Sequence, residues 1–442
     1  MAKKIFFHTK YGDGLALVPQ FQTEGYEVIV HIAEPFFRGL YEGFCDKDSD
    51  INHWTNAITK NDLVVFDAVG SGNLGDKLRA KGIPVYGGQL IADQLENDRM
   101  FGLKIMQQCG VKVPYTVKFT NRKEGINFIK NHKERYIYKP FGFGQASAKT
   151  FVSKDSAEML SFLTSQTKDE PYILQCFVEG NEYSTEMFFS KGEPVEPSFH
   201  TIEDKKAYAG ETGPATGCMN TVQIADKDLN NEPIKQGLGK CFEYLKKVKY
   251  TGNIDLNSII DKNGDLWGIE WTARDGWSSS YARNAMLDEP VSMLYSWIAN
   301  GDATKVELKK GVFGLSIRVA IPPYPLESTK ENEKYFNPLI KLSANKKIVV
   351  KKRDNVIYNF LDVKSGKDNL LTAGCDGIIL EVTTTDKDII KGRERLIEAI
   401  DGISLEDKWY RCDSFDRALE QIPLIQKLGF YDGPEFKGRE KE

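Results

Sequence analysis

The chain has 442 residues, of which 41% are hydrophobic and 28% charged, and its formal net charge is -4. This length predicts about two to four domains, and the weak charge argues against a nucleic-acid partner held by bulk electrostatics. The seven cysteines stand singly without a CxxC pair, which is typical of reduced thiols and unlike a metal site. Neither a signal-peptide pattern nor a run of roughly 18 apolar residues is present, so we expect a cytoplasmic protein without a membrane partner.

The first 95 residues alternate apolar runs with helix-like segments. The runs KIFFH, YEVIVHI and DLVVFDAVG predict strands of a parallel sheet covered on both faces, with helices at LALVPQFQTEG and DKLRAKG. The loops KYGDG and SGNLGD follow such strands, and open α/β sheets bind ligands at the carboxyl edge of their strands. Taken singly, each loop is better explained as an ordinary strand-to-helix turn.

The rest of the chain mixes α/β and α+β patterns. We expect one long helix over about 89–108 and then a small α/β unit that ends near residue 180. Paired strands follow, with a helix over about 228–247 and a β-hairpin that turns at residues 262–264. Beyond residue 313 the pattern returns to strands, one helix and a possible final helix in the charged tail. The sequence therefore predicts a multidomain fold with a parallel sheet at its N-terminal end and a β-rich C-terminal part.

The stretch from Lys139 to Glu182 combines cations, glycines and a carboxylate. Lys139 and Lys149 bracket the glycine-punctuated loop GFGQASAK, and the apolar strand YILQCFVEG precedes Glu182. Lysines neutralise phosphate, and glycines let backbone N–H groups approach its oxygens. The pattern indicates a nucleoside triphosphate site, although a plain hairpin explains a short motif of this kind about equally well.

The predicted hairpin NIDLNSII-DKNG-DLWGIEWTARDGW, residues 253–277, carries oxygen-bearing side chains. Glu270 and Thr272 point to one face of their strand, and Asp255 and Asn257 lie on the partner strand. One carboxylate with nearby oxygen ligands suits Mg²⁺, which keeps several waters and takes few protein ligands. Arg274, just beyond, could stabilise charge on a transferring phosphoryl group. A solvent-facing polar stripe is the alternative.

Residues 203–219 form a 17-residue segment without an apolar period, and we expect an irregular loop there. A long irregular segment inside a compact protein is more often functional than idle. Its cations suit an anionic substrate, and a solvated charged loop is the alternative. The residues of interest are Lys205, Lys206, Glu211, Gly213, Pro214, Thr216 and Gly217.

Taken in chain order, the segments described above resemble those of the ATP-grasp ligases, and specifically of the phosphoribosylamine–glycine ligases. The segment EDKKAYAGETGPATGCM is similar to the family's DHKR…D-x-GPNTGGMG without a gap. LENDR resembles the family's LEGSK, QCFVEGNE its EEFLDGEE, and IEWTARDG its LEFNVRFGD. GLSIRVAIPPYP and AGCDGIILEVTTT look like its C-terminal domain. The resemblance runs over nearly the whole chain.

The resemblance implies ATP with Mg²⁺ or Mn²⁺ and a site drawn from several domains. These would be an N-terminal (pre-ATP-grasp) substrate domain at 1–95, two ATP-grasp subdomains at 96–180 and 181–305, and a C-terminal domain at 306–442. The implied nucleotide-binding residues are Arg99, Lys139, Lys149, Gln175, Phe177 and Glu182. The implied metal ligands are Glu270, Asn257 and Thr272, the catalytic residues Arg274, Lys205 and Lys206, and the substrate residues Glu211, Gly213, Pro214, Thr216 and Gly217.

Several positions depart from the family's pattern. Thr272 replaces a metal-binding asparagine, and Ser147 falls where the lysine of the phosphate loop would be. Ala215 and Cys218 replace asparagine and glycine in the substrate segment. The loops KYGDG and AVGSG stand where the family has the two loops that hold phosphoribosylamine. The departures imply that the nucleotide site largely follows the family's pattern, whereas the pocket for the amine substrate differs from it.

We therefore expect a ligase that joins a small carboxylate, such as glycine, to an amine through an acyl phosphate. Two alternatives stay open: an ATP-grasp ligase for a different amino acid and amine, and a nucleotide-binding scaffold without catalysis. The expected partners are small molecules, and the expected state is a monomer or homodimer.

Overall fold

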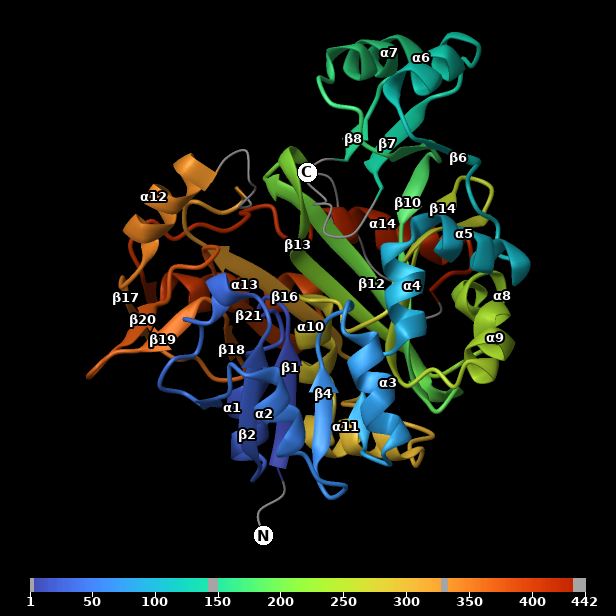
Figure 1. The fold of residues 1–442 in the computed structure, drawn as a ribbon. Coiled ribbons are helices and arrows are strands. Elements are labelled where there is room, and N and C mark those ends of the chain that lie inside the picture. Colours follow the sequence, from blue (N-terminus) through green and yellow to red (C-terminus); the bar gives the residue numbers. More distant parts are fainter. Residues whose placement is uncertain (1–3, 142–149, 327–332, 432–442) are drawn as a thin grey trace.

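The computed structural model describes residues 4–141, 150–326 and 333–431. Its described strands form one five-stranded, one nine-stranded and two four-stranded sheets, with helices packed around them (Figure 1). This confirms the predicted mixed α/β fold with a parallel sheet at the N-terminal end. All seven cysteines lie in the described part and are free thiols, as predicted. Among the described residues, no helix combines the length and apolar character needed to cross a bilayer.

The N-terminal sheet is parallel throughout and has the strand order β3-β2-β1-β4-β5. Neighbouring residues of β1 belong to different cores: Phe7 packs in one apolar cluster and Phe6 in another, so both faces are covered. The predicted loop SGNLGD is largely helical instead, because α3 already begins at Gly72, which lies against the backbone of Gln89. The elements are β1 (Lys4–Thr9), α1 (Leu17–Thr23), β2 (Glu27–Ile32), η1 (Pro35–Phe37), β3 (Asp46–Lys47), α2 (Ile51–Asn56), β4 (Leu63–Phe66), α3 (Gly72–Ala80) and β5 (Val85–Tyr86).

A four-stranded sheet of order β6-β9-β7-β8 projects at the top of Figure 1 with two helices on one face. Before it, the prediction of one helix over 89–108 is wrong, because the chain forms two helices that meet at Asp98. The Asp98 carboxylate accepts a hydrogen bond from the Phe101 amide at 3.0 Å and so caps a new helix. The elements are α4 (Leu90–Asn97), α5 (Arg99–Gln108), β6 (Thr116–Phe119), α6 (Arg122–Lys130), β7 (Tyr136–Pro140), β8 (Phe151–Val152), α7 (Ser156–Ser165) and β9 (Tyr172–Cys176).

The nine-stranded sheet forms the centre of the molecule. Its order is β10-β14-β11-β12-β13-β16-β21-β18, and β15 pairs with β14. Strands from beyond residue 306 therefore continue the sheet that begins at residue 180. Its strands are β10 (Gly180–Glu182), β11 (Ser184–Ser190), β12 (Glu193–Tyr208), β13 (Thr212–Asp226), β14 (Gly252–Asp261), β15 (Leu266–Thr272), β16 (Phe313–Ala320), β18 (Ile357–Phe360) and β21 (Ile378–Asp386).

Two predictions in this region are wrong and one is confirmed. Residues 203–219 are not an irregular loop: β12 and β13 run through them and turn at Gly210 and Glu211, which have φ of +70° and +55°. The helix expected over 228–247 is broken at Gly237 into α8 (Glu232–Gln236), η3 (Leu238–Cys241) and α9 (Phe242–Lys247). The β14–β15 hairpin turns as predicted, with Gly264 at φ +79°.

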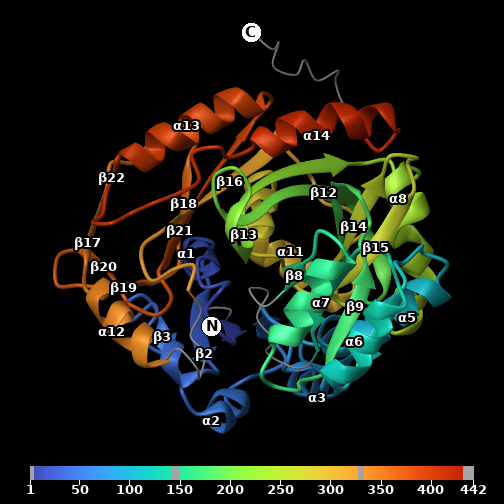
Figure 2. The same ribbon diagram turned by 90° about the horizontal axis from the view of Figure 1, so that it is seen from above.

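The C-terminal helices cover the large sheet from outside. Figure 2 shows α13 and α14 along one outer side, where α13 packs on β16 and β21 and α14 on β12. The final helix is confirmed as α14. The remaining elements are α10 (Ser279–Ala285), α11 (Val291–Asn300), α12 (Glu333–Ser343), β17 (Lys347–Val350), β19 (Val363–Ser365), β20 (Leu370–Thr372), α13 (Ile389–Asp401), β22 (Ile403–Ser404) and α14 (Asp416–Lys427).

One buried cation joins α10 to the large sheet. The Arg283 side chain is 0% exposed, and its guanidinium donates to Glu186 Oε2 at 2.9 Å and to Asp275 Oδ1 at 2.7 Å. The hydroxyls of Tyr86 and Tyr295 also donate to Asp275, at 3.1 Å and 2.8 Å. Burial alone would lower the pKa of Arg283, but the two carboxylates raise it above its ordinary value. The group is therefore a permanent ion triad inside the fold.

Candidate active site

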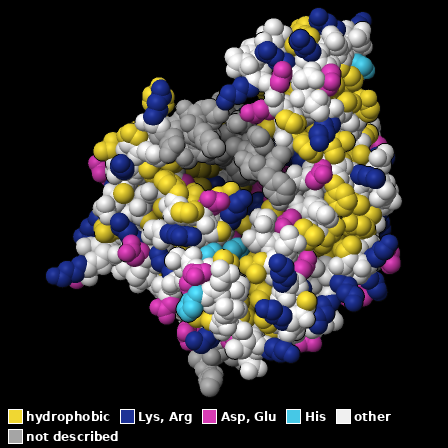
Figure 3. Space-filling view, in the orientation of Figure 1, with side chains coloured by type: hydrophobic (Ala, Val, Ile, Leu, Met, Phe, Trp, Pro, Cys, Tyr) yellow, Lys and Arg dark blue, Asp and Glu magenta, His cyan; other side chains and the backbone are white. Residues whose placement is uncertain are grey.

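One face of the large sheet is lined with polar side chains. Asn257 pairs with Glu270 and Asp255 pairs with Thr272 across the β14–β15 hairpin. Directly paired residues point to the same face of a sheet, as do alternate residues of one strand. These four side chains therefore share a face, which is the arrangement that the sequence pattern predicts. In the space-filling view, Lys or Arg and Asp or Glu side chains gather at the edge of a central hollow (Figure 3).

Glu270 is surrounded by cations from separate parts of the chain. Its carboxylate contacts the guanidinium of Arg99, the first residue of α5, and lies 3.9 Å from the Lys139 ammonium of β7. Burial alone would raise the pKa of Glu270, but Lys139, Arg99 and Lys205 outweigh it and hold the pKa well below its usual range. Glu270 is therefore an ionised carboxylate at any physiological pH.

Lys139 reaches the site from the small sheet. Its residue is only 7% exposed. Burial lowers the pKa of Lys139 to about 8. The negative charge of Glu270 opposes this shift, whereas the positive charges of Arg99 and Lys205 add to it. A buried cation whose carboxylate partner lies 3.9 Å away and is shared with Arg99 is a ready attachment point for an anionic group.

Lys205 and Glu182 form a second pair on the same side of the site. The Lys205 ammonium on β12 contacts Glu182 of β10 and lies 3.5 Å from Asn257 Oδ1. Burial alone would lower the pKa of Lys205, but Glu182, Glu203 and Glu270 raise it above its ordinary value. Arg417 of α14 lies 3.4 Å from the other Glu182 oxygen, and both cations hold the pKa of Glu182 down despite its burial.

Oxygen atoms suited to a metal gather beside Glu270. Asn257 Oδ1 accepts from Ser184 Oγ at 3.1 Å, and Asn257 Nδ2 donates to Thr272 Oγ1 at 3.0 Å. Asp255 Oδ1 is buried and has no hydrogen-bond partner within the described chain. Burial raises the pKa of Asp255 well above its usual value, and neighbouring carboxylates add to this.

These donors fit a hard cation that brings other ligands with it. Within residues 4–141, 150–326 and 333–431, no three His, Cys, Asp or Glu side chains form a metal cluster by themselves. Mg²⁺ takes few protein ligands and completes its shell with waters and phosphate oxygens. The residues Glu270, Asn257, Thr272 and the unpartnered Asp255 fit that kind of ion.

Arg274 extends the site toward the N-terminal sheet. Its Nε donates to Glu96 Oε1 of α4 at 3.0 Å, and Glu96 also accepts from the Ala273 amide at 2.8 Å. Burial alone would lower the pKa of Arg274, but Glu96 and then Asp13 raise it. Arg274 makes no ion pair with Glu270 in the part of the chain that the structure describes.

The two lysines expected to act together make different contacts. Lys205 contacts Glu182 within the charged centre, whereas Lys206 lies where the pairing of β12 with β13 is irregular on both sides. The Lys206 carbonyl accepts from Arg411 Nη1 at 2.9 Å. Lys149 and Ser147 lie outside the described residues.

The substrate residues expected at 211–217 occupy the tip of the β12–β13 hairpin. Glu211 accepts from Arg411 Nη1 at 2.8 Å, and its other oxygen lies 3.9 Å from Arg417. Thr216 Oγ1 donates to the Lys205 carbonyl at 2.8 Å, which fixes the hairpin next to the charged centre. Gly213 has φ of +79° and lies under the Tyr208 ring. The remaining two residues, Pro214 and Gly217, are exposed.

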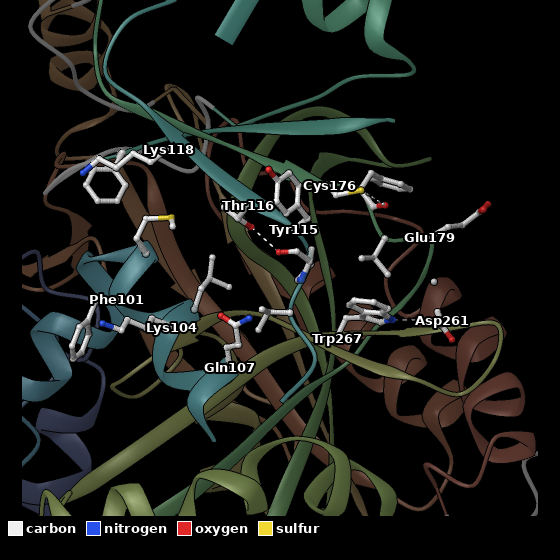
Figure 4. A pocket seen from close by; sticks show the side chains of 18 of the residues that line it. Phe101, Lys104, Gln107, Tyr115, Thr116, Lys118, Cys176, Glu179, Asp261 and Trp267 are labelled. Carbon is white, nitrogen blue, oxygen red and sulfur yellow. Dashed lines mark hydrogen bonds between the residues drawn. The ribbon is translucent and has the colours of Figure 1, made fainter. Parts of the chain in front are cut away.

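A groove of about 1540 Å³ lies between the small sheet and the large one. Register places Thr116, Lys118, Lys139 and Gln175 on the same face of the small sheet. Figure 4 shows Tyr115, Thr116 and Lys118 across the groove from Phe101, Lys104 and Gln107 of α5, with Trp267 at one end. The groove is wide enough for a nucleotide and carries apolar side chains.

Of the expected nucleotide-binding residues, Phe177 lines this groove and Gln175 is bonded to one of its lining residues. Gln175 Nε2 donates to Thr116 Oγ1 at 3.2 Å, and its buried Oε1 has no partner within the described chain. Phe177 lines the groove, and the Arg135 guanidinium stacks 3.6 Å from its ring centroid.

Sequence reasoning missed three charged residues of the site. Glu203 could have been found, because it is only two positions before Lys205, whose ammonium lies 3.8 Å from its carboxylate. Glu96 and Arg417 had no such signal, because each meets its partner across more than 170 residues of chain: Arg417 contacts Glu182 at a separation of 235 and Glu96 contacts Arg274 at a separation of 178.

Comparison with known proteins finds an ATP-grasp domain in the part of the chain that carries these residues. Residues 97–276 match the family model of the phosphoribosylglycinamide synthetase ATP-grasp (A) domain. A phosphoribosylamine–glycine ligase of Streptomyces coelicolor is 24% identical over 345 residues, covering 77% of this chain and 80% of the relative. The crystal structure of a Thermotoga maritima phosphoribosylamine–glycine ligase superposes with a TM-score of 0.70 at 17% identity, covering 93% of this chain and all 100% of that one. A Campylobacter jejuni biotin carboxylase in a β,γ-ATP complex gives 0.65 at 14% identity, with 97% of each chain covered, so it shares the fold.

Proposed function

We propose that this chain, which resembles the phosphoribosylamine–glycine ligases as a divergent ATP-grasp ligase, joins a small carboxylate to an amine at the expense of ATP. The observation that carries the proposal is the ionised Glu270 with Arg99, Lys139 and Lys205 around it. A cation cluster with one fixed carboxylate suits a triphosphate and its metal ion.

In the proposed complex, Arg99 and Lys139 leave Glu270 and turn to phosphate oxygens. Lys149, Gln175, Phe177 and Glu182 would complete the nucleotide site, with Glu182 accepting from ribose hydroxyls. Glu270, Asn257 and Thr272 would hold Mg²⁺ or Mn²⁺, and Asp255 has a free oxygen in the same place. When bound, the metal ion neutralises charge on the β- and γ-phosphates.

The proposed chemistry has two steps. An oxygen of the substrate carboxylate attacks the γ-phosphorus, the bond from that phosphorus to the ADP oxygen breaks, and an acyl phosphate forms. The amine nitrogen then attacks the acyl carbon, the carbon–oxygen bond breaks, and phosphate and a proton leave as the amide forms. Arg274 and Lys205 would stabilise negative charge near these steps, which depend mainly on positioning and electrostatics.

The test is ADP release with Mg²⁺-ATP and glycine, with phosphoribosylamine generated in place. Amine-dependent ADP formation would support the family's own reaction. ATP binding without ADP release for any carboxylate and amine would make the protein a scaffold and overturn the proposal.

A second candidate is the same ligation with another amino acid and amine. We include it because the two N-terminal loops carry Asp13 and Asp67, where burial and the charge of Asp13 raise the pKa of Asp67, and neighbouring carboxylates of this kind would repel a phosphate group. ADP release across a panel of amino acids and amines distinguishes the two.

The affinity for ATP should fall as the pH rises through 8. Lys139 has a pKa of about 8 in the free protein, so its ammonium is present below that pH and lost above it. Because ATP requires the charged form, its dissociation constant should rise about tenfold between pH 7 and pH 9. Calorimetric titration at several pH values measures this. In Lys139→Arg the guanidinium stays charged and the pH dependence should disappear; an unchanged slope in that variant would contradict the assignment.

A further inference from the structure

A small cavity lies where the N-terminal sheet, the large sheet and the C-terminal part meet. Its walls come from the loop after β1 (Tyr11 to Asp13), from Trp277, from Arg318 of β16 and from Asp376 before β21. Its volume of about 20 Å³ is enough for one small polar group. We call it the Asp13 cavity. Arg274 connects it to the centre described above, because the charge of Asp13 acts on Arg274.

The two arginines near the Asp13 cavity already have anionic partners, and the Lys10 ammonium lies 4.9 Å from the ring centroid of Tyr11. Arg318 is 6% exposed, and its Nε donates to Glu381 Oε1 at 2.7 Å. Its Nη1 donates to the Tyr324 hydroxyl at 3.1 Å. Arg274 is paired with Glu96 at 3.0 Å. Neither arginine therefore brings uncompensated positive charge to the cavity.

The carboxylates there are compensated unequally. Asp362 is satisfied, because it accepts from four backbone amides in the turn at residues 374–377, at 2.8 to 2.9 Å. Within the described residues, the Asp376 side chain accepts one hydrogen bond, from the Ile378 amide at 2.8 Å. The Asp13 carboxylate has no hydrogen bond or ion pair with another described residue. Asp13 and Asp376 are therefore acidic groups without a cation of their own in the described part of the chain.

A buried carboxylate stands behind Asp13. Asp67 is 1% exposed and accepts from the Gly14 amide at 2.9 Å, while its Oδ1 is buried without a partner within the described chain. Burial and the charge of Asp13 raise the pKa of Asp67 to about 7. Burial likewise raises the pKa of Asp13 and of Asp376, where Asp362 adds like charge. A bound cation would relieve this repulsion.

The remaining walls favour the same kind of ligand. Trp277 and Tyr11 line the cavity, and aromatic rings attract cations, as the Lys10 ammonium 4.9 Å from the Tyr11 ring centroid illustrates. A phosphate group would meet two unpaired carboxylates and is also too large for the volume.

From this charge balance we propose that the Asp13 cavity binds an ammonium group of the amine substrate, so that the substrate class is an unphosphorylated aliphatic amine. The inference rests on the proposed ligase function and names its second substrate. The bound ammonium can be a second one on the same molecule, or it can become the attacking amine after it gives a proton to the carboxylate of Asp13 or Asp376.

The experiment uses the full chain saturated with Mg²⁺ and a non-hydrolysable ATP analogue. Ligand-observed NMR titrations would compare ethanolamine with O-phosphoethanolamine, and butylamine with 1,4-diaminobutane. We expect ethanolamine to bind at least about tenfold more tightly than its phosphate ester. If butylamine and the diamine bound equally, the cavity would hold the nitrogen that later attacks. If the diamine bound more tightly, the cavity would hold a second ammonium. Either result would support the proposal that the cavity binds an ammonium group. Tighter binding of the phosphate ester would overturn it.

Matched variants locate the effect. Asp13→Asn and Asp376→Asn keep the side-chain size and should each weaken amine binding about tenfold. Asp302→Asn removes an exposed carboxylate after α11 and should change nothing. Unchanged amine affinity in both cavity variants would refute the proposal. If the wild-type chain did not bind the ATP analogue, the ligase function would be refuted instead. The failure of the proposed function and the failure of the cavity proposal are therefore distinguishable.

Discussion

Replacing Glu270 by glutamine will abolish ADP formation, with turnover at least about 10³-fold below that of the wild type. The Glu270 carboxylate contacts Arg99 and lies 3.9 Å from the Lys139 ammonium, and these cations hold its pKa far below its usual range. Glutamine keeps the size and removes the charge that would hold the metal ion. Coupled-enzyme detection of ADP under saturating Mg²⁺-ATP measures the effect.

Thr272→Asn is the matched control for Glu270→Gln. Thr272 shares the hairpin face with Glu270 and accepts from Asn257 at 3.0 Å, so the change replaces one neutral oxygen by another. Its turnover should equal or exceed that of the wild type, because an amide oxygen is a better ligand for Mg²⁺ than a hydroxyl. A near-wild-type rate for Glu270→Gln would show that the metal assignment is wrong.

Replacing Arg283 by methionine will destabilise the fold by about 3–5 kcal/mol. The guanidinium is fully buried between Glu186 and Asp275, at 2.9 Å and 2.7 Å. Methionine fills a similar volume but leaves two carboxylates without their cation. The tyrosine hydroxyls on Asp275 supply hydrogen bonds and no positive charge. Urea denaturation followed by circular dichroism gives the change in unfolding free energy.

The matched control is Arg353→Met. Arg353 pairs with Glu398 on the surface, with side-chain exposures of 45% and 56%. An exposed pair of this kind contributes about 0–1 kcal/mol. If Arg283→Met lost no more stability than Arg353→Met, the buried ion triad would not stabilise the fold. The polar groups around Glu186 and Asp275 would then be sufficient to stabilise both carboxyl groups without the arginine.

Local patterns predicted the parts of the site that lie close together in sequence. The β14–β15 hairpin has period-two alternation and a glycine turn, so its register and the shared face of Asn257 and Glu270 follow directly. The cations that surround Glu270 come from α5, β7 and β12, and no local pattern specifies that they converge. Their positions came from the family resemblance and not from periodicity.

The incorrect element boundaries have local causes. Asp98 reads as a tolerated residue inside a helix, yet its side chain caps a new helix at Phe101. Gly237 interrupts the helix predicted after residue 228, because its backbone, at φ of -115° and ψ of -110°, leaves the helical region. The β12–β13 hairpin was predicted as a loop because its inner face is polar, so the apolar half of the usual alternation is missing there.

The continuity of the large sheet affects how the protein can be made. β13 ends at Asp226, and its outer neighbour β16 begins only at Phe313. During synthesis, which proceeds from the N-terminus, the free edge of β13 has no partner until roughly a further ninety residues have emerged. An unpaired edge is a template for strands of other chains. A fragment that ends near residue 305 would therefore lack β16, expose the edge of β13 and be prone to aggregation.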